Sequence, residues 1–118
     1  MKLSASIVIP ARFKSSRFPG KPLAKINGRE LILRVYDACK KSKLCKEIYV
    51  ATDDRRIEKF CKRNKIKTIF TSKKCITGTD RVAEAALKIS SDIIINVQGD
   101  EPLVSYKDID KIIKKKIN

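Results

Sequence analysis

The sequence predicts an α/β fold, a Rossmann-like and mostly parallel sheet with helices on both faces. Four short apolar runs are typical of buried strands, and segments with the period of an amphipathic helix separate them. A chain that alternates strand and helix implies right-handed crossovers, and therefore a parallel sheet layered by helices. With 118 residues we expect a single domain.

The first half of the chain predicts a strand, a loop, a helix and a second strand. The β-branched run 6–9, closed by Pro10, is typical of a buried strand. Residues 10–22 contain three prolines and a glycine, which favours a loop. Apolar residues then recur at the helical period, so we expect a helix over about residues 29–41. Residues 47–51 form the second predicted strand.

The second half repeats this alternation. Residues 52–54 can cap a helix, and residues 67–70 predict a third strand. The next helix is indicated by one apolar stripe: Val82, Ala85, Ala86 and Ile89. Residues 92–97 are apolar nearly throughout, as in a strand buried on both faces. Ser105 and Asp108 match a capping box that opens the last helix.

The charge of the chain favours anionic partners. Lys and Arg number 28 and Asp and Glu 13, so the formal charge is +15, and residues 1–29 carry basic but no acidic side chains. Nucleotides, nucleic acid and acidic lipid all fit this charge. A non-catalytic nucleic-acid-binding module remains an alternative, but the chain has few aromatic residues on which bases could stack, so we do not favour nucleic acid as a partner.

Other features exclude several function classes. The longest apolar run, residues 93–95, is too short to span a membrane, and the N-terminal apolar stretch is too short for a signal peptide, so we expect a cytoplasmic protein. The four cysteines are too far apart for a Cys-x-x-Cys motif, and no histidine is present. A sulfur-held metal and a Ser-His or Cys-His nucleophile are therefore disfavoured. We expect Cys39 and Cys61 to be buried in the core.

A polar cluster follows each predicted strand, at residues 12–21, 52–54, 78–81 and 98–102. Ligands of such sheets bind beyond the carboxyl ends of the strands, so we expect the four clusters to share one rim. The first cluster lacks both common glycine-rich phosphate motifs. It does hold several cations suited to phosphate oxygens, although a solvated basic loop is an alternative: Arg12, Lys14, Arg17 and Lys21.

The last of these clusters is the candidate metal site. Asp100 and Glu101 follow a buried strand, and carboxylate oxygens together with substrate phosphates suit Mg²⁺. The alternative is a solvent-facing acid pair in a turn. For residues 52–54 and 78–81, helix capping explains the pattern, although the second loop could also present backbone N–H groups to a ligand.

Four segments, residues 9–23, 50–54, 77–81 and 96–102, resemble the motifs of the CMP-Kdo synthetase family, the 3-deoxy-manno-octulosonate cytidylyltransferases. They follow the family's order and spacing over nearly the whole chain. The resemblance implies a nucleotide-diphospho-sugar transferase type of fold. It also implies a cytidylyltransferase that joins CTP to Kdo, giving CMP-Kdo and pyrophosphate for lipopolysaccharide biosynthesis.

The resemblance implies roles for individual residues. Arg12, Lys21 and Asp100 would be catalytic, and Asp100 would hold Mg²⁺. The nucleotide-binding set would bind the triphosphate through its first four members and the cytidine or sugar through the others: Arg12, Ser15, Arg17, Lys21, Gly78, Thr79, Arg81 and Gln98.

The chain also departs from the family. Residues 74–77 replace the family's Asp-His-Gln-Ser run, and family members are substantially longer. We therefore expect residues 1–118 to be the N-terminal nucleotide-binding part of a truncated domain. The missing half would carry the region that forms the family's homodimer, much of the Kdo pocket and a second metal-binding Asp. We expect weak CTP binding, negligible turnover and self-association through an exposed strand at 93–97. Enzymes for sialic acid or amino-Kdo remain alternatives.

Overall fold

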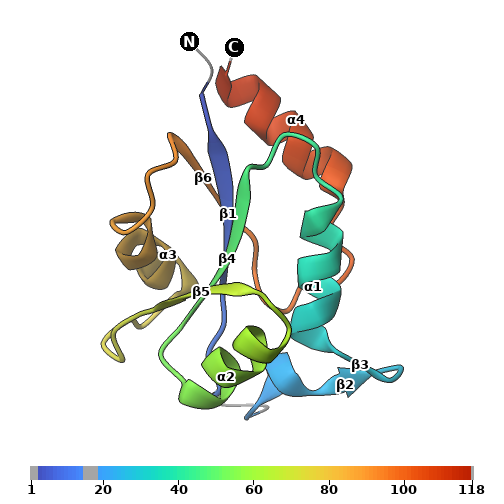
Figure 1. The fold of residues 1–118 in the computed structure, drawn as a ribbon, viewed down its shortest axis with the longest axis vertical. Helices are drawn as coiled ribbons and strands as arrows, with labels where there is room; N and C mark the ends of the chain where they lie inside the picture. The colour runs from blue at the N-terminus through green and yellow to red at the C-terminus, as the bar shows by residue number, and fades with distance from the viewer. Residues whose placement is uncertain (1–2, 15–18, 118) are drawn as a thin grey trace.

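The computed structural model describes residues 3–14 and 19–117. Figure 1 shows the long strands between helices that lie on either side. In chain order the elements are β1 (Ala5–Pro10), the 3-10 helix η1 (Lys21–Leu23), β2 (Lys25–Ile26), β3 (Arg29–Glu30), α1 (Leu31–Lys40), β4 (Glu47–Thr52), α2 (Arg55–Arg63), β5 (Lys67–Phe70), α3 (Gly78–Ala86), β6 (Ile93–Asn96) and α4 (Tyr106–Ile117). Within these described residues, no helix combines the length and the apolar character that crossing a membrane requires.

The four long strands form one parallel sheet in the order β5-β4-β1-β6. Ile7 in the central strand β1 is in register with Ile48 of β4 and Ile95 of β6. The chain runs from β1 to β4 and β5 on one side, and then returns to the other side of β1 as β6. A crevice forms at such a reversal, beyond the carboxyl ends of the two strands. The predicted α/β fold with a parallel sheet is confirmed.

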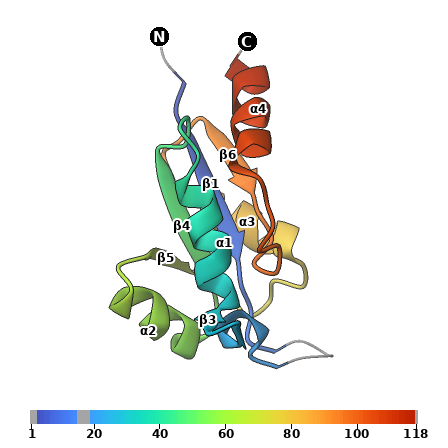
Figure 2. The same cartoon turned by 90° about the vertical axis from the view of Figure 1, so that its right-hand side faces the viewer.

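Helices cover both faces of this sheet, as Figure 2 shows from the side. Ile32 of α1, Ile57 of α2 and Ile113 of α4 are fully buried in the larger cluster, on one face. On the other face α3 contributes Val82 and Ala85 to a smaller cluster. Removal of these apolar side chains from water is the main stabilising contribution, about 25 cal/mol for each Å² buried.

A small hairpin precedes α1 and was missing from the sequence-based prediction. β2 and β3 pair antiparallel around Asn27 and Gly28, whose φ angles are 52° and 82°. Asn-Gly is the strongest short signal for a two-residue hairpin turn, because both positions need positive φ. Residues 29 and 30 are therefore strand, and the helix that we expected from residue 29 begins at Leu31.

The helix caps agree only in part with prediction. Thr77 and Asp80 form a reciprocal capping box at the start of α3, and Asp54 accepts from the backbone N–H groups of Arg56 and Ile57 at the start of α2. At α4 the Ser105 hydroxyl accepts instead from the Lys107 N–H, at 3.2 Å. A capping box requires a contact between the cap side chain and the N–H of the third residue after it. That contact forms at α3, whereas at α4 the Ser105 hydroxyl contacts the second residue. The predicted stripe to residue 89 is also too long, since α3 ends at Ala86.

Strand β6 differs from the fully buried strand that we predicted. Ile93 and Ile95 are buried, but Ile94 is only partly buried and Asn96 is exposed. The reason is position, because β6 pairs with β1 alone and forms an edge of the described sheet. An unpaired edge offers its backbone groups to another chain.

The cysteines behave as predicted. All four are free thiols, and Cys39 and Cys61 are fully buried in the larger core cluster. Burial disfavours the charged thiolate and raises the pKa of both thiols to about 12.

Candidate functional site

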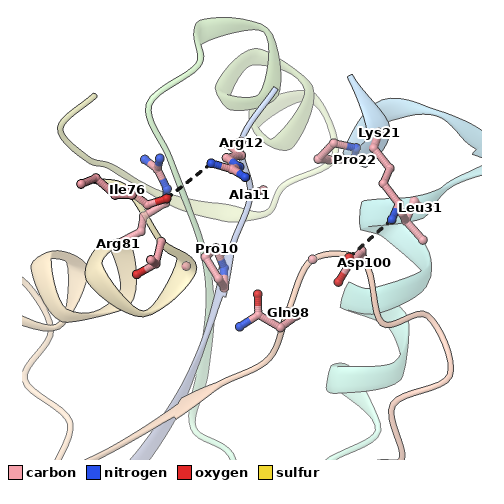
Figure 3. A pocket seen from close by; sticks show the side chains of 13 residues that line it. Pro10, Ala11, Arg12, Lys21, Pro22, Leu31, Ile76, Arg81, Gln98 and Asp100 are labelled. Carbon is pink, nitrogen blue, oxygen red and sulfur yellow. Dashed lines mark hydrogen bonds and ion pairs between the residues drawn. The ribbon is translucent and has the colours of Figure 1, made fainter. Parts of the chain in front are cut away.

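A cavity of about 410 Å³ opens at the strand reversal, beyond the ends of β1 and β6 (Figure 3). This volume lies in the range of small-molecule sites, about 300–1,000 Å³. Its lining comes from five separate segments of the chain: Pro10, Ala11, Arg12, Lys21, Pro22, Leu31, Ile76, Thr77, Gly78, Arg81, Gln98, Gly99 and Asp100.

Cations and one carboxylate face each other across this cavity. Lys21 Nζ lies 3.4 Å from Asp100 Oδ2, and the two side chains are about half exposed. Arg12 donates from its guanidinium to the Ile76 carbonyl oxygen at 3.4 Å, as the dashed lines in Figure 3 show. A long, exposed ion pair contributes little stability, so these groups can exchange partners at small cost when an anion enters. Arg12 and Asp100, from two of the clusters expected to share one rim, thus line the same cavity.

The floor of the cavity depends on two glycines. A Cβ on Gly99 would lie 2.8 Å from the Pro10 carbonyl oxygen, so only glycine lets the loop after β6 approach the end of β1 this closely. A Cβ on Gly78 would lie 3.0 Å from the side-chain oxygen of Gln98. The Gln98 amide in turn donates to Asn96 Oδ1 at 3.1 Å. The glycines thus bring three segments together.

Among the described residues of the cavity wall, Arg81 is the buried cation, with a side chain 4% exposed. Its guanidinium donates to Thr71 Oγ1 at 2.5 Å and to Asp53 Oδ2 at 3.3 Å. We expected residues 52–54 to act as helix caps. Asp54 does so, and its hydrogen bond with the Arg56 side chain is the main reason why the pKa of its carboxyl is lowered. Asp53 pairs with Arg81 instead.

A second cavity, of about 720 Å³, adjoins the first and shares Arg12 and Arg81 with it. Arg55 lies 3.8 Å from the centre of the Phe70 ring, and Arg56 lies 3.3 Å from the centre of the Phe13 ring. These stacked cations, with Lys14, give the same edge of the sheet a positive field that favours anions. Described members of the four polar clusters lie along these two adjoining cavities, as the shared rim predicts.

Six of the predicted site residues line the first cavity: Arg12, Lys21, Gly78, Arg81, Gln98 and Asp100. Thr79 is exposed and absent from the lining, where Thr77 stands instead. Ser15 and Arg17 lie outside the described residues. Sequence reasoning assigned no contact to Ala11, Leu31 or Ile76. Ala11 and Ile76 lie beside predicted residues, whereas nothing in the pattern around Leu31 distinguishes it from other core positions.

Among the described residues that line this cavity, Asp100 is the single carboxylate. Within residues 3–14 and 19–117, no group of three or more potential metal-ligating side chains occurs. Among the described residues, the protein side of a metal site here therefore offers one carboxylate, which solvent can reach. Such a donor fits Mg²⁺, which is commonly bound by one or two carboxylates together with substrate phosphates and water.

Comparisons with known proteins agree with this geometry. A family model described as "Cytidylyltransferase" matches residues 6–118. The 3-deoxy-manno-octulosonate cytidylyltransferase of Geobacter metallireducens is 47% identical over 96% of this chain, and the 8-amino-3,8-dideoxy-manno-octulosonate cytidylyltransferase of Shewanella piezotolerans is 42% identical over 94%. The alignments cover 44% and 46% of those relatives, so the chain spans less than half their length.

A solved structure gives the same result. The structure of a CMP:2-keto-3-deoxy-manno-octonic acid synthetase complexed with CTP superposes with a TM-score of 0.92 at 42% identity. The superposition covers 95% of this chain and 46% of that one. The resemblance expected from the motifs is confirmed, and the chain belongs to the cytidylyltransferase family.

Proposed function

We propose that this chain is the nucleotide-binding part of an enzyme that transfers the cytidylyl group of CTP to Kdo, giving CMP-Kdo and pyrophosphate. The observation that carries the proposal is the cavity at the strand reversal, where Arg12, Lys21 and Asp100 face one another. The 42% identical structure with CTP bound supports the choice of nucleotide. The four free cysteines fit a reducing compartment, which supports a cytoplasmic location. The homodimer implied by the family resemblance stays a prediction.

The reaction needs no covalent nucleophile on the protein. The anomeric hydroxyl oxygen of the sugar attacks the α-phosphorus of CTP, the bond from that phosphorus to the bridging oxygen breaks, and pyrophosphate leaves with the electron pair. The hydroxyl proton passes to solvent. Arg12 and Lys21 donate to the phosphate oxygens and offset the negative charge that builds up on them. Their place on a proline-rich loop and on η1 limits the cost of ordering them.

Asp100 is the residue proposed to hold Mg²⁺. When bound, the ion would neutralise phosphate charge and orient the leaving group. Lys21 contacts the same carboxylate at 3.4 Å, so a nucleotide that arrives with the ion would draw Lys21 toward its phosphates and leave Asp100 free to ligate. The remaining contacts to the cytidine or sugar are proposed for Gly78, Arg81 and Gln98, with Thr79 retained from the motif although it lies outside the cavity lining.

A second sugar is supported by a specific observation. The Shewanella piezotolerans relative, at 42% identity, is named for an 8-amino-3,8-dideoxy sugar. Both sugars present a carboxylate and the same type of reacting hydroxyl, so the cavity described here does not separate them. Product analysis with both sugars decides between the two.

The nucleotide part of the proposal is tested by calorimetric titration of the chain with CTP and with ATP, each with and without MgCl₂. We expect saturable CTP binding that Mg²⁺ strengthens, and weaker ATP binding. Lys21→Ala and Asp100→Asn should each weaken CTP binding at least about tenfold, the effect of losing about 1.4 kcal/mol. Lys107→Ala, an exposed lysine on α4, is the matched control. Equal affinity for CTP and ATP would contradict the proposal.

The transfer step is tested by following CTP, Kdo and the chain by ³¹P NMR. We expect slow CMP-Kdo formation at most, because one carboxylate gives an incomplete metal shell. Rapid turnover by the chain alone would contradict this single-carboxylate site.

A further inference from the structure

Arg81 differs from every other cation in the two cavities. The side chain of Lys21 is 45% exposed, whereas that of Arg81 is 4% exposed and contributes to the walls of both cavities. A guanidinium removed from water is costly unless it is paired and hydrogen-bonded. The residues that pair with Arg81 therefore determine whether its guanidinium can stay buried.

The partners of Arg81 lie directly after two strands of the sheet. Asp53 follows β4, Thr71 follows β5, and Arg81 lies in the first turns of α3. Thr71 is itself fixed, because it is buried and its backbone N–H donates to the Thr52 carbonyl oxygen at 2.8 Å. Three segments that are distant in sequence thus meet at one guanidinium.

The adjacent residues Asp53 and Asp54 have different partners. Asp54 accepts from two backbone N–H groups of α2 and pairs with the Arg56 side chain. Asp53 is left for Arg81, whose guanidinium has five donors. Among the described residues, Thr71 and Asp53 accept from two different terminal nitrogens, so both are fixed while further N–H groups of Arg81 remain for an acceptor in the cavity.

We propose that Asp53 and Thr71 are positioning residues that fix Arg81 so that its guanidinium presents donors to an oxygen acceptor of the bound nucleotide. The proposal rests on the function proposed above and deepens it. Asp53 and Thr71 are positioning residues because neither lines the first cavity, where the nucleotide is proposed to bind. The proposal predicts that CTP affinity depends on a hydroxyl and a carboxylate outside the lining of that first cavity, with Asp53 in the lining of the second.

The test combines two measurements on the full chain. The first follows the side-chain Nε–H resonance of Arg81 by ¹H–¹⁵N NMR in the absence of nucleotide. We expect a sharp, exchange-protected signal in the unmodified protein, in Thr71→Ser and in Asp54→Asn. We expect it to broaden in Asp53→Asn and in Thr71→Val, which remove the counter-charge and the hydroxyl. Asp54→Asn is the matched control, since Asn also caps helices well.

The second measurement is CTP affinity. Asp53→Asn and Thr71→Val should each weaken binding about tenfold or more, and Thr71→Ser and Asp54→Asn should change it less than about twofold. In an Arg81→Lys background, Asp53→Asn should have no further effect, because residues that act through one group are not additive. If Asp53→Asn does not fold, the Thr71→Val and Thr71→Ser pair makes the same comparison.

The outcomes separate this proposal from the one before it. CTP binding that Asp53→Asn and Thr71→Val leave unchanged would overturn the positioning role alone, and so would an Arg81 signal that both variants leave sharp. A protected Arg81 signal in a chain that binds no CTP would overturn the proposed function, and with it the nucleotide as the acceptor.

Discussion

Replacing Gly99 with alanine tests how the cavity floor is built. The new Cβ would lie 2.8 Å from the Pro10 carbonyl oxygen, whereas ordinary contact begins at 3.4 Å, so β1 and the loop after β6 must separate by about 0.6 Å. The obstacle is backbone, which cannot rotate away as a side chain can. Forcing an extra methyl into such a contact costs about 1–3 kcal/mol. We expect Gly99→Ala to lower the free energy of unfolding by that amount, measured by urea denaturation.

The same substitution should weaken CTP binding about tenfold, because Pro10 and Gly99 both line the cavity and small displacements have large effects on a positioned ligand. Gly28→Ala is the control. Gly28 has φ +82° and no neighbour within 4 Å of its Cβ position, so alanine there is strained by about 1 kcal/mol without contact with the site. A stable Gly99→Ala protein with unchanged CTP affinity would refute the reasoning.

Three further results are expected. Burial would raise the pKa of the Asp110 carboxyl, but hydrogen bonds from Ser42 and from two backbone N–H groups outweigh it and lower that pKa. The stabilisation is therefore present above about pH 4 and lost as pH falls through the lower folded-state value. Between pH 6 and pH 3, the free energy of unfolding measured with urea should fall less in Asp110→Asn than in the unmodified protein. An equal fall in both proteins would contradict this. Cys39 and Cys61 should resist thiol reagents until the protein unfolds, so rapid labelling of all four cysteines at pH 8 would be inconsistent with their burial. The open edge of β6 should cause self-association that light scattering detects, and a clean monomer at high concentration would count against it.

Much of the architecture follows from local patterns. Helical periodicity located α1 to within a few residues and indicated α3, cap residues marked the starts of α2 and α4, and the β-branched runs located all four strands of the sheet. The hairpin at Asn27 and Gly28 also has a local signal, because the Asn-Gly pair favours a two-residue turn with positive φ at both positions. The exposure of Asn96 has no such signal, since whether a strand is central or at an edge depends on pairing between distant segments.

The candidate site divides in the same way. Residue chemistry and chain order alone determined that a basic loop and an acid after the last strand would share one edge of the sheet, because parallel strands bring their carboxyl ends together. Only the tertiary structure decided that Asp53 pairs with Arg81 while its neighbour Asp54 caps α2, and that Thr77 rather than Thr79 faces the cavity. Those choices depend on which side chains meet across segments far apart in the chain, and the packing of α3 against β1 and β4 sets that geometry.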